Sequence, residues 1–242
     1  MKAVILAAGM GKRLEKANID KPKSMINFGN KSIIQYQIES CLENSIDRFI
    51  VVVGYQADML KSHVLNFLPK DRVTFVENPI YQKTNTLYSL WLTRKYLDDN
   101  FIYFNADVLF DSRLLPKIVN NHKYSELLVE MKECAQEEVK VILDEDRRIR
   151  AIGKQLPLFK CSGEFVGVGK FVKATIPDFI NYLHKGVENG EENNYFEYAV
   201  NLLSVTQKLY AVPTDNLPCI EIDFPEDLKR AKEKIFPKIK TV

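Results

Sequence analysis

The apolar residues of the first half of the chain follow two alternating spacings. Strands are expected at 3–8, 48–55, 72–78 and 101–110, and the run at 3–8 is continuously apolar, as is typical of strands buried on both faces of a parallel sheet. Between them, apolar positions recur every three or four residues, as on one face of a helix, over 31–44, 56–67 and 84–97. Strands that alternate with helices predict an α/β fold with a doubly wound, mostly parallel sheet.

The pattern changes at about residue 124. Several strands are expected there in succession, at 126–132, 139–145, 147–153 and 163–171. The remaining expected elements are helices near 174–186 and 194–204, strands at 208–213 and 218–222, and a closing helix that begins at Pro225. No segment rich in Gly, Ser or Pro interrupts the chain, so a single domain over 1–242 is expected.

The composition narrows the class of protein. Hydrophobic residues make up 46% of the 242 residues and the net charge is +2, so no nucleic-acid partner is expected. The first apolar run is about six residues long, short for a signal peptide, and no run approaches the ~18 residues that span a membrane. The four cysteines are widely separated and are expected to be small apolar residues in a reducing compartment, the cytoplasm, with no membrane partner. The three scattered histidines argue against a zinc site.

Two glycines and two cations follow the first strand in "LAAGMGKRL". A P-loop needs a different glycine spacing, and a dinucleotide fingerprint needs a third glycine where Leu14 stands. Two interpretations remain: an ordinary strand-to-helix turn with solvated cations, or a loop whose backbone N–H groups surround a nucleotide phosphate while Arg13 holds the polyphosphate. Glycine permits the close approach, and the arginine fork binds two phosphate oxygens.

Three further positions favour phosphate binding. "KPKSM" places Lys23 directly after a proline that stiffens the backbone, at a spacing that suits a second phosphate contact. Asp107 lies where the fourth strand breaks, and Asp223 lies at the end of the last strand. Ligands of open α/β sheets bind beyond the carboxyl ends of strands, where one or two carboxylates with phosphate oxygens can hold Mg²⁺. Asp223 has an equally good alternative role as the N-cap of the closing helix.

The order of these motifs is itself informative. "LAAGMGKRL", "KPKSM", "VVVGY", "NADVLF" and "EIDFPEDLKRA" resemble the motifs of nucleotidylyltransferases, which join a nucleotide to a sugar phosphate or to phosphocholine. The resemblance covers nearly the whole chain, and "TNTLYSLWL" is most similar to the phosphocholine cytidylyltransferase-like branch. It implies a Rossmann-like, three-layer αβα fold of the GT-A type. Residues 1–123 would then bind the nucleotide, and 124–242 would bind the acceptor and supply the closing helix.

The resemblance also implies roles for individual residues. Arg13 and Lys23 would be catalytic, with Arg13 on the β and γ phosphates and Lys23 on the α phosphate or the incoming phosphate. Asp107 and Asp223 would bind Mg²⁺. The residues near the nucleotide would be Leu6, Ala7, Ala8, Gly9, Gly11, Lys12, Arg13, Asn85 and Ser89.

Other positions bear on the acceptor. Ala106 replaces the glycine that usually precedes the metal-binding aspartate, which crowds the metal site slightly, and "EKANI" at 15–19 replaces a Pro-Leu-Thr segment and leaves the choice of acceptor open. Glu164 and Glu197 are candidates for acceptor contacts. Tyr88 and Trp91 could surround a choline ammonium, but on a periodic helix they are expected to belong to the core.

The expected reaction is attack of a phosphate monoester on the α phosphorus of a nucleoside triphosphate, with loss of pyrophosphate. CTP is the favoured partner, and transfer from UTP to a sugar 1-phosphate is the alternative. A GT-A glycosyltransferase usually carries a D-x-D pair, whereas here Asn105 precedes Asp107 by two positions. A non-catalytic nucleotide sensor would be expected to lack Lys23 or a metal-binding carboxylate.

Overall fold

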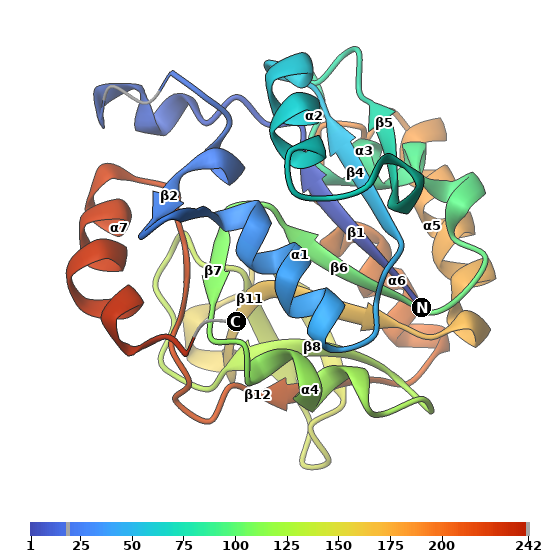
Figure 1. Cartoon of the computed structure of the whole chain (residues 1–242). Coiled ribbons are helices and arrows are strands. Elements are labelled where there is room, and N and C mark those ends of the chain that lie inside the picture. Colours follow the sequence, from blue (N-terminus) through green and yellow to red (C-terminus); the bar gives the residue numbers. More distant parts are fainter. Residues whose placement is uncertain (18–19, 241–242) are drawn as a thin grey trace.

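Four parallel strands form the centre of the molecule (Figure 1). The structure is a computed structural model that describes residues 1–17 and 20–240, so Asn18 and Ile19 of "EKANI" lie outside the described residues. The strands are ordered β6-β1-β4-β5 in the sheet. Their bounds are β1 (Lys2–Ala7), β4 (Phe49–Val53), β5 (Val73–Glu77) and β6 (Phe101–Asn105). All of β4 and nearly all of β1 are buried, which explains their continuous apolar sequences.

The same sheet continues into the second half of the chain with mixed directions. β11 (Gly163–Phe171) pairs antiparallel with β6, β8 and β9, β10 pairs antiparallel with β9, and β12 pairs parallel with β8. The bounds of these other strands are β8 (Ser125–Glu130), β9 (Lys140–Leu143), β10 (Ile149–Gly153) and β12 (Leu209–Pro213). The predicted mixed sheet is therefore confirmed, and one sheet joins both halves of the chain.

Helices cover both faces of the sheet, as a three-layer αβα arrangement requires (Figure 1). One face carries α1 (Ile33–Glu43), α2 (Ala57–Leu65) and α4 (Leu114–Val119). The other carries α3 (Thr86–Leu92), α5 (Ile176–Glu188) and α6 (Glu197–Thr206). The sequence pattern did not predict α4, because six residues are too few to display a helical repeat.

A smaller lobe lies beside the sheet and packs an early segment of the chain against a late one. Its strands are β2 (Asn27–Phe28), β3 (Lys31–Ser32), β7 (Val108–Phe110) and β13 (Cys219–Glu221), and its helix is α7 (Pro225–Arg230). β13 pairs antiparallel with β7, with Glu221 opposite Val108. Short helical turns complete the described elements: η1 (Lys12–Ala17), η2 (Lys23–Met25), η3 (Lys70–Arg72), η4 (Arg94–Tyr96), η5 (Leu158–Lys160), η6 (Lys173–Thr175), η7 (Ala231–Ile235) and η8 (Phe236–Lys238).

The cysteines differ from the expectation of four separate apolar residues. Cys134 and Cys161 form a disulfide, with an S–S distance of 2.09 Å, whereas Cys41 and Cys219 are free thiols. The prediction was wrong for this pair because β8 pairs antiparallel with β11, with Glu130 opposite Glu164, so that the segment after β8 lies beside the segment before β11. No helix in residues 1–17 or 20–240 combines the length and apolar character needed to cross a lipid bilayer.

A buried ion pair joins β8 to β11. Lys170 and Glu126 are opposite each other across these strands, and the Lys170 side chain is fully buried. Lys170 Nζ lies 2.7 Å from Glu126 Oε2 and also donates to the carbonyl oxygens of Ile118 and Asn121. Burial lowers the pKa of Lys170, and the hydrogen bond and charge of Glu126 oppose that change. These three hydrogen bonds satisfy the ammonium inside the protein.

We expect Lys170→Met to lower the free energy of unfolding by roughly 3–5 kcal/mol, because it leaves the Glu126 carboxylate buried without its partner. Lys117→Met removes an ion pair with the exposed Asp215 and should cost less than about 1 kcal/mol. Urea unfolding followed by circular dichroism measures both variants. Equal losses would contradict a special contribution of the buried pair.

Candidate active site

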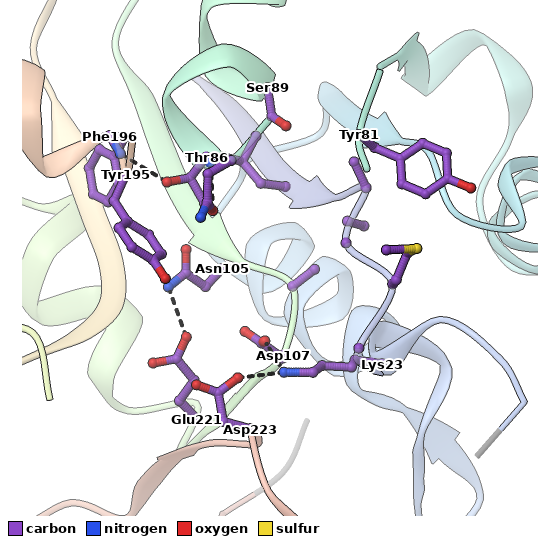
Figure 2. A pocket seen from close by; sticks show the side chains of 18 of the residues that line it. Lys23, Tyr81, Thr86, Ser89, Asn105, Asp107, Tyr195, Phe196, Glu221 and Asp223 are labelled. Atoms are coloured by element: carbon purple, nitrogen blue, oxygen red, sulfur yellow. Dashed lines mark hydrogen bonds and ion pairs between the residues drawn. The ribbon is translucent and has the colours of Figure 1, made fainter. Parts of the chain in front are cut away.

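A pocket of about 420 Å³ opens at the carboxyl ends of β1 and β6. The loop after β1 forms one wall, and the start of α3 forms another. Lys23, Asp107 and Asp223 lie together on one side, while Tyr195 and Phe196 lie across from them (Figure 2). The pocket therefore lies where ligands of open α/β sheets bind.

The glycine loop borders this pocket along its whole length. Gly11 has a φ of +63°, and a Cβ there would lie 2.8 Å from Lys23 Cγ, so the turn and the close contact both require glycine. The N–H of Tyr55 donates to the Ala8 carbonyl oxygen at 3.0 Å, which fixes the start of the loop. A Cβ on Gly9 would contact nothing within 4 Å, so the loop is open on that side. The predicted loop residues that line the pocket are Leu6, Ala7, Ala8, Gly9, Gly11, Lys12 and Arg13.

Lys23 joins the two aspartates. Its Nζ lies 3.1 Å from Asp107 Oδ2 and 2.5 Å from Asp223 Oδ1 (Figure 2), and Arg13 Nη1 lies 3.1 Å from Asp223 Oδ2. Burial alone would lower the pKa of Lys23, but the charges and hydrogen bonds of both aspartates together raise it well above its usual value. Burial likewise acts to raise the pKa of Asp223, and the cations outweigh it, so that pKa is lowered. The pairing of β13 with β7 brings Asp223 close to Asp107, although the two residues are far apart in the sequence.

Glu221 is a third carboxylate in the pocket that the sequence analysis missed. Asn105 Nδ2 donates to Glu221 Oε1 at 3.2 Å (Figure 2). Tyr103 Oη donates to Asn105 Oδ1 at 2.5 Å. Burial and the charges of Asp107 and Asp223 raise the pKa of Glu221 well above its usual value. The signal was present in "EID", because residues two apart on a strand point to the same side.

Asn85 and Ser89 both line the pocket, and each also has a structural role. The Asn85 Oδ1 atom accepts a hydrogen bond from the N–H of Thr86 at 2.9 Å and so caps α3. Asn78 Nδ2 donates to Ser89 Oγ at 3.1 Å below the pocket wall. The start of α3 is therefore held rigidly beside the loop.

The two glutamates predicted to contact the acceptor lie in different places in the structure. Glu197 lines the pocket, whereas Glu164 lies outside it and forms an ion pair with Lys132 at 2.7 Å. Trp91 is half-buried, stacks between Tyr88 and His184, and does not line the pocket. Trp91 packs against the hydrophobic core, as expected, and Tyr88 stacks on Trp91.

Burial makes the Glu197 carboxyl a weaker acid than usual. It raises the pKa of this carboxyl from 4.5 to about 7, while its own backbone N–H and Lys154 oppose the change. Lys154 directly follows β10 and lines the pocket. Tyr103 on β6 lines it as well. The ionised form of Glu197 is therefore less stable in the folded protein than in water.

The fold and the pocket together are those of a nucleotide-binding α/β transferase. Residues 2–140 match the family described as nucleotidyl transferase, and the chain belongs to this family of nucleotidyltransferases. It is 26% identical to the CTP:phosphoglutamine cytidylyltransferase of Campylobacter jejuni, over 97% of this chain and 100% of the relative. It is 27% identical to the choline-phosphate cytidylyltransferase of Streptococcus pneumoniae, over 96% of this chain and 97% of the relative.

Solved structures agree with this assignment. The inositol-1-phosphate CTP transferase from T. maritima matches 99% of this chain and 96% of its own, with a TM-score of 0.82 and 25% identity. The predicted family and the Rossmann-like fold are therefore confirmed.

We expect Lys23→Ala to lower turnover by at least ~10²-fold, because it removes the preorganised positive charge that lies between the two aspartates beside the glycine loop. Lys21→Ala is the matched control, since Lys21 lies on the other side of Pro22 and does not line the pocket. Steady-state kinetics of both variants, with circular dichroism to confirm folding, make the comparison. Near-normal turnover of Lys23→Ala would contradict the assigned role.

The raised pKa of Glu197 predicts a pH dependence of stability. A carboxyl that binds its proton more tightly when folded makes the free energy of unfolding fall as pH rises from 4.5 to about 7. We expect Glu197→Gln to remove a decrease of roughly 3 kcal/mol over this window, since each pKa unit is worth about 1.4 kcal/mol. Thermal unfolding of wild type and variant from pH 4.5 to 7.5 measures the difference. Glu145→Gln, at an exposed carboxylate, should follow wild type.

Proposed function

We propose that this nucleotidyltransferase transfers CMP from CTP to a small phosphate monoester and releases pyrophosphate. The observation that carries the proposal is the Lys23 ammonium held between Asp107 and Asp223, beside the glycine loop. Cations and carboxylates meet there at one point, which suits a reaction between two phosphate groups. The names of the relatives from C. jejuni, S. pneumoniae and T. maritima support CTP as the nucleotide, and UTP is the alternative.

The two halves of the chain divide the substrates in this proposal. Within 1–123, the backbone from Leu6 to Gly11 would surround the nucleotide, Arg13 would hold the β and γ phosphates, and the start of α3 would border the nucleoside. Within 124–242, the segment around Glu197 would contact the acceptor. Lys23 lies where the two substrates would meet.

Asp107 and Asp223 fit a magnesium ion. Both carboxylates approach the same ammonium group, at 3.1 Å and 2.5 Å, so their oxygens face a common point. Mg²⁺ uses one or two carboxylates and completes its shell with water and substrate phosphates. When bound, the ion would neutralise charge on the triphosphate.

The residues of the chain would act by position and charge. The attacking oxygen of a phosphate monoester is already an anion, so the step needs no general base from the protein. Lys23 would exchange its carboxylate partners for phosphate oxygens and hold the acceptor phosphate in line with the α phosphorus. Arg13 would neutralise charge on the departing pyrophosphate, and the loop N–H groups would fix the phosphates without moving.

A pyrophosphate-release screen tests the proposal. It crosses ATP, CTP, GTP and UTP with phosphorylated alcohols, alditols and sugars, each with Mg²⁺ and with EDTA. We expect release with CTP and at least one phosphate monoester, its loss in EDTA, and its return on addition of Mg²⁺. Asp107→Ala, measured with the best pair, should reduce release by at least ~10²-fold.

The other outcomes separate the rival functions. Release from UTP with a sugar 1-phosphate alone would favour the uridylyl alternative. Activity that is unchanged in EDTA would remove the metal from the proposal. No release with any pair would overturn it and favour a nucleotide sensor.

A further inference from the structure

A second pocket of about 510 Å³ adjoins the first. Arg13, Lys154, Tyr195 and Glu197 line both pockets, so the two are continuous. Residues 6–12 border only the first pocket, whereas the second is formed by the turn after β10 and the start of α6. The second pocket is therefore placed to hold the part of an acceptor that is remote from its phosphate.

Glu197 lies at the junction of the pockets with an unsatisfied oxygen. The residue is only 7% exposed, and no group in the described part of the chain lies within hydrogen-bonding distance of its Oε2 atom. Buried carboxylate oxygens are normally paired, because an unpaired one loses its water without compensation. A hydrogen-bond donor on a bound ligand would supply the partner.

Hydrogen bonds from α3 hold this carboxylate in place. Two backbone hydrogen bonds, of 2.9 and 3.2 Å, join residues 85–87 to residues 192–194. The N–H of Phe196 donates to Thr86 Oγ1 at 2.8 Å (Figure 2), and the Phe196 ring stacks on Tyr103 at a centroid distance of 4.1 Å. Glu197 is therefore fixed relative to the nucleotide side of the site.

A lysine side chain already contacts the aromatic ring at this junction. Lys154 Nζ lies 5.1 Å from the centroid of the Tyr195 ring, within the range of a cation–π contact. The buried Lys140 ammonium fixes this turn, because it donates to the Lys154 carbonyl oxygen at 2.6 Å and to those of Gln136 and Glu138. A quaternary ammonium on the same face of the Tyr195 ring would have to displace Lys154, and it has no N–H to give to Glu197.

We infer that Glu197 accepts a hydrogen bond from a neutral donor, a hydroxyl or an amide N–H, on the part of the acceptor remote from its phosphate. The acceptor is then a hydroxylated or amide-bearing phosphate ester, and Glu197 determines that specificity. The inference rests on the proposed function and adds to it the class of acceptor.

The test uses matched alkyl phosphates of two to five carbons, together with alditol phosphates. The far end of each alkyl chain carries a methyl, hydroxyl, carboxamide or trimethylammonium group, and kcat/KM for pyrophosphate release is measured with CTP. We expect the best hydroxyl or carboxamide ester to exceed its methyl and trimethylammonium counterparts by at least ~10-fold, since an unpaired buried group penalises analogues without a donor.

Variants of Glu197 then assign the preference to this residue. Glu197→Met keeps the length of the side chain but has no oxygen, so the preference for a donor should fall to about one while methyl-terminated esters are still used. Glu197→Gln retains an accepting oxygen and should keep part of the preference. Glu192→Met is the control, because Glu192 lines neither pocket, and it should behave as wild type.

Three results would overturn the inference. One is a wild-type preference for the trimethylammonium ester. Another is an unchanged donor preference in Glu197→Met. The third is an equal loss with every ester in Glu197→Met, which would indicate a structural role. In all three cases pyrophosphate is still released, so the proposed function stands; absence of release from wild type with every ester would reject both.

Discussion

The charge balance around Lys23 is the constraint on which the rest of the site depends. Its ammonium group joins Asp107 and Asp223, which lie 84 and 200 residues away in the sequence. Without a ligand, these groups neutralise one another in a partly buried place, where unpaired charges would be costly. In the proposed reaction, a triphosphate and Mg²⁺ would supply the same two signs of charge, so substrate binding would exchange one balanced set of contacts for another.

The fold provides the rigidity that this exchange needs. The pairing of β13 with β7 sets Asp223 beside Asp107, and the glycine turn at Gly11 leaves just enough room for the Lys23 side chain. Tyr103 and Asn105 continue the polar network to Glu221. Because these contacts come from a central strand and its neighbours, the charged groups hold their positions before substrate arrives, which is the condition for electrostatic stabilisation of a transition state.

The two substrate regions are connected through α3 and α6. Backbone hydrogen bonds from 85–87 to 192–194 place the start of α6 against the helix that borders the nucleotide side. Glu197 is the first residue of α6, so its position depends on the same contacts that shape the first pocket. In the proposed function, recognition of the acceptor and of the nucleotide would therefore depend on one shared set of contacts.

The chain's local pattern was sufficient for the strands of the main sheet, most helices, the glycine loop and the break at Asp107, because each depends on residues within a few positions of one another; it did not predict the two-residue strands β2 and β3. It did not predict α4, which is too short to show a period, or the Cys134–Cys161 disulfide, which depends on how β8 pairs with β11. From the sequence, Asp223 could equally be a metal ligand or the N-cap of the closing helix, and only the tertiary structure showed that it pairs with Lys23. The same holds for Glu197 and Glu164, two similar carboxylates of which one lines the pocket and the other pairs with Lys132. Strand register and long-range packing decide such contacts, and no local spacing encodes them.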